Sequence, residues 1–241
     1  MKHHLRALPT TEAGAPDAAD GPSLGPELRV DLHVHSCHSD RPYSYFLRSG
    51  KAAECYTRPE TVHELATRRG MDLVTICDHD EIAGAIELCA RTEHAFVSEE
   101  VSARLPEDGC VMHTIVLGLD ETQHREIQEL RRNVYELVAY LQAAGLPYFL
   151  CHPLSSVNRR LTAHHLRRAL LMFPALELRN GTRDQLHEQE LTAILTALTP
   201  ATLAGWASDH PEAPWVTRDA RYAVVGGSDD HGGLAIGRAY T

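Results

Sequence analysis

From residue 28 onward, segments with the pattern of β-strands alternate with segments with the pattern of α-helices. The expected strands cover 28–34, 72–77, 95–103, 111–118, 147–151, 175–178 and 223–227, and the expected helices cover 57–69, 80–91, 121–144, 162–171 and 182–198. Strands separated by helices form mostly parallel sheets, because each helix returns the chain to the starting edge. This alternation predicts an α/β fold, built either as an open sheet or as a small barrel.

The composition supports a folded domain and disfavours several classes of partner. Hydrophobic residues make up 43% of the 241 residues, so a substantial core can be buried. The formal net charge of −10 disfavours binding to long duplex nucleic acid, which depends on clustered lysine and arginine. No apolar run reaches the roughly 18 residues that span a bilayer, and the N-terminus lacks the pattern of a signal peptide, so we expect no membrane partner.

The cysteines and the irregular segments indicate the compartment and the domain limits. The six cysteines form no CxxC pair and most lie in apolar stretches, which predicts reduced thiols in a cytoplasmic protein. Residues 1–27 lack periodicity and are expected to form a mobile leader, whereas 28–241 are expected to form one domain. Residues 41–56 follow the first strand, where a short loop is typical, and are expected to form an insertion. The sequence leaves the oligomeric state open.

Polar side chains recur at the ends of the expected strands, in a chain that contains 16 histidines. In the first strand, Asp31, His33 and His35 alternate with apolar residues and therefore share one face. Further acids and imidazoles occur in or directly after the later strands, at 78–80, 99–100, 113, 152, 177 and 229–231. Because binding sites form where the carboxyl ends of parallel strands meet, we expect these side chains to converge.

Convergence of these groups predicts a metal centre. An isolated buried carboxylate costs several kcal/mol, and a buried neutral imidazole still needs a partner. About nine such groups without a counter-charge would destabilise a domain whose net stability is only about 5–15 kcal/mol. Imidazole and carboxylate ligands suit Mn, Fe or Zn. So many ligands suit two or three divalent ions, with a carboxylate such as Glu100 bridging neighbouring ions.

Taken as a set, the motifs resemble the PHP family, which is named for polymerase and histidinol phosphatase domains. The matching segments, in family order, are DLHVHS at 31–36, Ser39-Asp40, Asp78-His79-Asp80, Glu100-Val101-Ser102, His113, His152-Pro153 and Ser228-Asp229-Asp230-His231. The resemblance implies a distorted (β/α)7 barrel over residues 28–241, with its metal site at the C-terminal ends of the strands. It also implies the hydrolysis of phosphate esters.

The resemblance further implies three groups of metal ligands. One ion is held by His33, His35, Glu100 and Asp229, a second by Glu100, His113 and His152, and a third by Asp40, His79 and His231. Glu99 competes with Glu100 for the bridging role, and the register with Ser102 favours Glu100.

Other residues are expected to assist the metal centre. Asp31, Asp78 and His231 are candidates to orient ligands or to transfer a proton. Arg159 and Arg179 follow strands on the site face and are candidates to bind the substrate phosphate.

The expected reaction is metal-assisted transfer of a phosphoryl group to water, in which hydroxide formed at the ions attacks phosphorus. The expected substrate is a small phosphorylated metabolite or a nucleotide. A C–N bond metallohydrolase of the amidohydrolase type also begins with an HxH motif, but such enzymes usually bridge their metals with a modified lysine. No lysine occurs after Lys51, which disfavours that alternative. A metal-stabilised binding module without turnover is a further alternative, which the complete ligand set disfavours.

Overall fold

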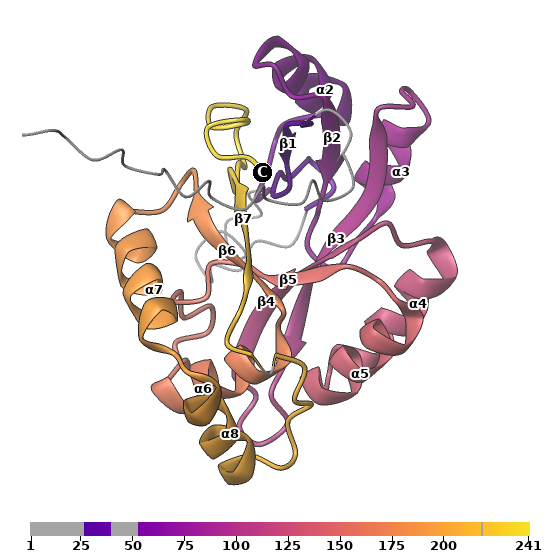
Figure 1. Cartoon of the computed structure of the whole chain (residues 1–241). Helices are drawn as coiled ribbons and strands as arrows, with labels where there is room; N and C mark the ends of the chain where they lie inside the picture. Colours follow the sequence, from indigo (N-terminus) through magenta and orange to yellow (C-terminus); the bar gives the residue numbers. More distant parts are fainter. Residues whose placement is uncertain (1–26, 40–52, 218) are drawn as a thin grey trace, which may run out of the picture.

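The computed structural model describes residues 27–39, 53–217 and 219–241 (Figure 1). Nearly all of the expected leader lies outside the described residues, and so does Asp40, one of the expected metal ligands. Only the last four residues of the expected insertion, 53–56, are described.

Within these residues, seven strands form a single sheet whose spatial order follows the chain order (Figure 1). They are β1 (Val30–Asp31), β2 (Leu73–Ile76), β3 (Ala95–Arg104), β4 (Val111–Leu117), β5 (Tyr148–Leu150), β6 (Ala175–Asn180) and β7 (Ala223–Gly227). All neighbouring strands are parallel except at β4, which is antiparallel to both β3 and β5. The reversal arises because a short hairpin, rather than a helix, joins β3 to β4.

The sheet curves into a nearly closed barrel. The seam between β1 and β7 is bridged by residues outside both strands. Thr241 exchanges two backbone hydrogen bonds with Val30, of 3.0 and 2.9 Å, and its hydroxyl accepts the N–H of Gly226. Val34 and Asp230 form a further parallel bridge across the seam. The predicted distorted α/β barrel is therefore confirmed.

Seven helices lie around the outside of the barrel in the described part of the chain (Figure 1). They are α2 (Pro59–Arg68), α3 (Ala83–Cys89), α4 (Glu121–Leu130), α5 (Val134–Ala144), α6 (Ala163–Met172), α7 (Gln185–Ala197) and α8 (Pro200–Asp209). No single described helix is long and apolar enough to span a membrane. The pair α7–α8 passes that test of length and composition only when taken together, and the two helices meet at an angle of 94°.

Two helix limits differ from the sequence prediction. The single helix expected over 121–144 is divided into α4 and α5, because Asn133 starts a new helix by accepting the N–H of Tyr135. The region after residue 200 was expected to be irregular but forms α8. Pro200 occupies the first helical turn, where its missing N–H costs nothing, and the Thr199 side chain accepts the N–H of Thr202.

A small apolar cluster of residues that lie in or directly after the strands fills the floor of the barrel. It consists of Leu32, Cys77, Ile115, Phe149 and Cys151, each at most 6% exposed. Ile115 lies two residues from His113 on β4, so both side chains project from the same face of this strand. The strands thus carry apolar residues at the floor and polar residues at the mouth. All six cysteines are free thiols.

Two glycines in helices offer a test of how the fold holds the loop after β1. A methyl group on Gly84 in α3 would collide with the carboxylate of Asp78 and lie 2.5 Å from Ser36 Oγ. We expect Gly84→Ala to lower the free energy of unfolding by about 1–3 kcal/mol, because overpacking must displace these groups. Gly205→Ala in α8 meets nothing within 4 Å and is expected to raise the free energy of unfolding by about 0.5–1 kcal/mol.

Urea denaturation of the two variants and the wild type measures both effects. Equal stability of Gly84→Ala and the wild type would contradict the tight packing of α3 against the loop.

Candidate metal centre

The structure brings eight of the nine predicted metal ligands together at the mouth of the barrel, and Asp40 is the one outside the described residues. The eight are His33, His35, His79, Glu100, His113, His152, Asp229 and His231. Each lies in or just after a strand, so the barrel fixes the relative positions of residues that are far apart in the chain. Asp229 and His152 adopt positive φ angles, of 53° and 29°, a conformation that few non-glycine residues adopt.

Glu100 lies at the centre of this group, with its side chain 1% exposed. Its Oε2 atom faces three imidazole nitrogens at 3.0–3.3 Å, those of His33, His35 and His79. Its Oε1 atom faces His113 Nδ1 at 2.7 Å and His152 Nε2 at 3.3 Å. Each carboxylate oxygen therefore points into its own set of imidazoles, as a carboxylate that bridges two cations does.

Glu99 points away from this group. Its carboxylate accepts hydrogen bonds from His124 and Gln128 of α4, at 2.8 and 3.1 Å. Burial raises the pKa of Glu99. Of the two candidates for the bridging role, the structure therefore places only Glu100 among the imidazoles.

The hydrogen bonds of His35 determine which of its ring nitrogens directs a lone pair at Glu100. Ser39 Oγ donates to Asp78 Oδ1 at 2.9 Å, so it accepts from His35 Nδ1 at 3.1 Å. In the neutral ring, Nε2 then carries a lone pair directed at Glu100 Oε2, 3.1 Å away, and it is buried without a hydrogen-bond partner. Two buried acceptors that face each other require a cation, either a proton or a metal ion, between them.

Glu177 orients His33 in the same way. Its Oε1 lies 2.8 Å from His33 Nδ1, and its Oε2 accepts the backbone N–H of His152 and the amide of Asn180. The other ring nitrogen, Nε2, faces Glu100 Oε2 at 3.3 Å and Asp229 Oδ1 at 3.5 Å. A carboxylate behind an imidazole fixes its tautomer and increases its basicity as a metal ligand. The sequence signal for this role is only that Glu177 is an acid within an otherwise apolar strand.

Asp229 divides its two oxygens between the site and the surrounding donors. Oδ1 faces His33, whereas Oδ2 accepts from Asn180 Nδ2, Thr182 Oγ1 and Arg183 Nη2, at 3.2, 3.4 and 3.2 Å. Burial favours a higher pKa, but the nearby imidazoles of His33 and His152 outweigh it and hold the pKa of Asp229 below its ordinary value. Asp229 is therefore available as an anionic ligand.

His79 and His231 form the outer part of the group. The His231 ring stacks on His35, with centroids 4.0 Å apart, and its Nδ1 donates to the carbonyl of Asp229 at 3.1 Å. Burial and the adjacent His35 ring lower the pKa of His231 to about 4. Burial also lowers the pKa of His79. Both rings are therefore neutral at physiological pH, the form in which imidazole binds metals.

Four groups of three side chains in the described part of the chain place their ligand atoms within 4.8 Å of one another. They are His33–Glu100–His152, His79–Glu100–His113, His35–His79–His231 and His33–His35–Cys77. The first two combine imidazole and carboxylate ligands and the third consists of imidazoles alone, and both kinds of group suit Mn, Fe or Zn. Together with the buried lone pair of His35, they show that the residues present fit divalent metal ions.

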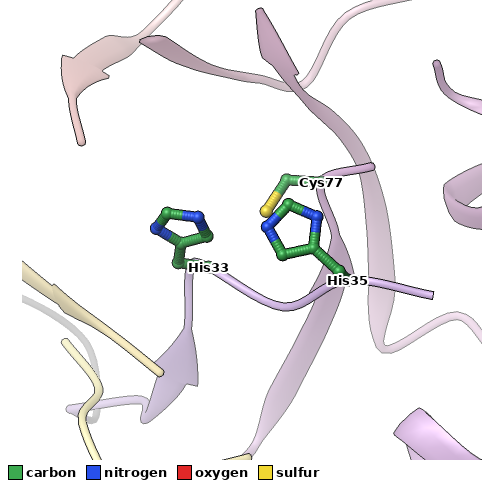
Figure 2. A group of neighbouring side chains, drawn as sticks. All are labelled: His33, His35 and Cys77. Carbon is green, nitrogen blue, oxygen red and sulfur yellow. The ribbon is translucent and has the colours of Figure 1, made fainter. Parts of the chain in front are cut away.

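Figure 2 shows the fourth group, in which the sulfur of Cys77 lies beside the rings of His33 and His35. The thiol donates to the carbonyl of Val34 at 3.4 Å, and burial raises its pKa well above the ordinary value. A protonated thiol is a poor ligand. We therefore assign Cys77 to the floor of the barrel.

The predicted catalytic residues Asp31 and Asp78 brace the loops that carry the ligands. Asp31 accepts three backbone N–H groups, those of His33, Ser228 and Gly237, and burial raises its pKa to about 6. Asp78 accepts from the backbone N–H and hydroxyl of Ser36 and from Ser39 Oγ, at 2.7–2.9 Å. The third predicted catalytic residue, His231, lies in the site itself.

Two cavities adjoin the imidazoles. One, of about 250 Å³, is lined by His79, His113, His152, Asp229 and His231, together with Glu54, Ser155, Ser156, Val157 and Arg183. The other, of about 470 Å³, lies between β6 and α7 and shares only His152 and Arg183 with the first. Glu54 was not among the predicted site residues, because nothing in its local sequence distinguishes it from a surface acid.

The predicted phosphate-binding arginines lie away from the smaller cavity. Arg159 is exposed and lines neither cavity. Arg179 lines the larger cavity, but its guanidinium is paired with Glu188 at 3.1 Å. Among the described residues that line the smaller cavity, the lone lysine or arginine is Arg183.

No family model matches the chain, and no curated protein matches it in sequence. Solved structures do match. An amidohydrolase from Chromobacterium violaceum, with bound sulfate and no metal, is 15% identical, with a TM-score of 0.56 over 88% of this chain and 90% of that one. A protein from Bifidobacterium adolescentis assigned as a metal-dependent phosphoesterase is 17% identical, with a TM-score of 0.53 over 88% and 92% of the two chains.

A two-domain protein from Bacteroides vulgatus contains a predicted PHP-like metal-dependent phosphoesterase. It is 16% identical to this chain, with a TM-score of 0.51 over 92% of this chain and 58% of that one. At such identities the likeness concerns the fold. The chain therefore has the fold of the PHP-like metal-dependent phosphoesterases, which confirms at the level of fold the family resemblance of its motifs.

Proposed function

We propose that this protein hydrolyses phosphate esters of small metabolites or nucleotides at a centre of two or three divalent ions, with Mn, Fe and Zn as the candidate metals. The observation that carries the proposal is the buried Glu100 carboxylate, both of whose oxygens face imidazole nitrogens. Metal ions at such a centre polarise a phosphoryl group and lower the pKa of bound water toward about 7.

The residues divide into ligands and groups that position them. We propose that His33, His35, Asp229 and Glu100 hold one ion, and that Glu100, His113 and His152 hold a second. Glu177 keeps the lone pair of His33 directed into the site, and Ser39 does the same for His35. Asp31 and Asp78 act indirectly, by fixing the backbone of the loops that carry the ligands.

Arg183 is the group that we propose to bind the substrate phosphate. It lies at the junction of the two cavities, and its side chain is 41% exposed. Its contact with Asp229 Oδ2 holds the guanidinium beside the ligands and leaves its other N–H groups for an oxyanion. Arg159 and Arg179, the residues suggested by the sequence, remain alternatives that the variants below can test.

The volumes of the cavities favour a small substrate. The larger cavity, of about 470 Å³, falls within the range of about 300–1,000 Å³ that is typical of small-molecule sites, and the smaller, of about 250 Å³, lies just below it. The formal charge of −10 makes a long duplex an unfavourable partner. The free cysteines agree with action in the cytoplasm, which we also propose.

Hydrolysis of a C–N bond is the second candidate, because one similar structure is an amidohydrolase. Against it, the bridging position between imidazoles is held by Glu100, and the described residues include no lysine that could be modified to take this role. A non-catalytic metal-binding module is the third candidate. The assays below distinguish all three.

Activity on chromogenic phosphate monoesters and diesters in the presence of Mn or Zn is the direct test. We expect turnover by the wild type and a loss of at least about 100-fold in His33→Ala, because removing an orienting group alone typically costs 10–100-fold. Hydrolysis of an amide substrate but of neither phosphate ester would favour the second candidate. Turnover of no substrate by metal-loaded protein would favour the binding module.

The variants of Arg183 test its proposed contact with phosphate. We expect Arg183→Gln to raise KM and the inhibition constant of inorganic phosphate by about 10–100-fold, because a hydrogen bond to a charged group contributes about 1.5–3 kcal/mol. Arg183→Lys should recover part of the loss. The exposed Arg221→Gln serves as the control. A larger effect in Arg159→Gln or Arg179→Gln than in Arg183→Gln would assign the phosphate contact to those residues.

The stability of the metal-free protein should depend on pH, and bound metal should weaken this dependence. Burial disfavours charge on His33 and His35, but facing carboxylates outweigh it and raise the pKa of both above 6.5. Their stabilising contribution is therefore complete below pH 6.5 and is lost as the pH rises through the raised values. Chemical denaturation with a chelator should show a free energy of unfolding that falls as the pH rises above 6.5.

Metal replaces these protons, so the same measurement with saturating Mn should show a smaller decline over this range. If the stability of the metal-free protein instead rose with pH, the inference that carboxylates face the imidazoles of His33 and His35 would be contradicted.

A further inference from the structure

We propose that Glu54, at the end of the insertion that follows the first strand, is a metal ligand in an outer ion site with His79 and His231. This inference rests on the proposed metal centre, but it concerns a residue and a segment that the motifs of that centre do not include. It gives the described end of the insertion, residues 53–56, a chemical role.

Glu54 reaches the site from a different direction than the strand-end residues. Its Oε2 lies 3.8 Å from His79 Nε2, and the two side chains are 15% and 14% exposed. Both line the 250 Å³ cavity, together with His231. Ligand atoms that lie about 2.0–2.2 Å from one zinc-like ion are roughly 3–3.5 Å apart, so a small movement brings Glu54 and His79 to coordination distance.

The His79 ring lies between two carboxylates. Nδ1 faces Glu100 Oε2 at 3.0 Å, and Nε2 faces Glu54 Oε2 at 3.8 Å. A neutral imidazole has a single N–H, so one of these nitrogens always directs a lone pair toward a carboxylate. In either tautomer of His79 a lone pair and a carboxylate face each other. A cation bound beside His79 relieves the repulsion between them.

The charges at the cavity also favour Glu54 as a ligand. Among the described residues that line it, the carboxylates are Glu54 and Asp229. Asp229 directs Oδ1 at His33 and shares Oδ2 among three donors, so it is committed to the inner part of the site. An ion beside His79 and His231, to which the motifs also assign Asp40, is stabilised by each further anionic ligand, because neighbouring divalent ions repel each other. Glu54 supplies that charge on the outer side.

The chain around Glu54 is fixed to the loop that carries His35. The thiol of Cys55, which is fully buried, donates to the carbonyl of His35 at 3.3 Å. Two residues further on, the carbonyl of Thr57 accepts the N–H of Cys37 at 2.8 Å. Glu54 is thus held beside the ligands by two contacts within three residues of it, and little conformational entropy is lost when it binds an ion.

Metal content is the test, because it does not depend on activity. Wild type, Glu54→Gln, Glu54→Asp and the control Glu60→Gln are stripped with a chelator, reloaded with Mn or Zn, desalted and analysed by elemental analysis and titration calorimetry. Glu60 lies on α2 in loose ion pairs with Arg58 and Arg91, so its substitution leaves the site intact. Circular dichroism and the melting temperature of the metal-free proteins verify folding.

We expect Glu54→Gln to bind one ion fewer than the wild type, or to bind its weakest ion at least about 10-fold less tightly, with Glu54→Asp intermediate and Glu60→Gln unchanged. Equal metal content and affinity in Glu54→Gln and the wild type would overturn the inference and leave the proposed function intact. Loss of every ion in a folded Glu54→Gln would also overturn it, since an outer ligand cannot control the inner sites. A wild type that binds no metal would refute the proposed function itself.

Discussion

At the mouth of the barrel, buried hydrogen-bond acceptors face one another without enough donors between them. The rest of the site depends on this constraint. Five imidazoles face the two oxygens of Glu100, and the rings of His33 and His35 already direct one nitrogen to Glu177 or Ser39. Fully buried acceptors cannot turn to water for a partner. This excess of buried acceptors makes the group of side chains compatible with bound cations, and it is the basis of the proposed metal centre.

Buried carboxylates that do not face the site hold this arrangement together. Asp31, Asp78 and Asp230 each accept several backbone or hydroxyl donors from the loops after β1 and β7. Such bonds orient the loops without placing further charge next to the ions. Buried carboxylates thus have two roles in this structure. Those that accept several backbone or hydroxyl donors hold the loops in place, whereas Glu100 is surrounded by imidazoles at the site.

The sequence predicted the parts of the site that depend on local pattern. Asp31-Leu32-His33 and Asp78-His79-Asp80 stand at strand ends, and strand period and barrel topology bring such residues together without any knowledge of the loops. Glu54 escaped prediction because its role arises from a contact with His79, which is distant in the chain. Arg183 is one of several arginines that follow β5 and β6, and only its contact with the distant Asp229 distinguishes it from Arg159 and Arg179. The start of α8 was missed for another reason, since a proline after a helix signals an end as readily as a beginning.

The apolar floor formed by Leu32, Cys77, Ile115, Phe149 and Cys151 has a consequence for exchange with solvent. A cation cannot pass through a layer that offers it no charged ligand, so the ions of the proposed centre would arrive and depart through the same opening that admits the proposed substrate. A molecule seated in that opening would slow the escape of the ions below it. Occupancy by reactant and retention of metal are therefore kinetically linked, and a chelator should act more slowly on the occupied protein than on the free one.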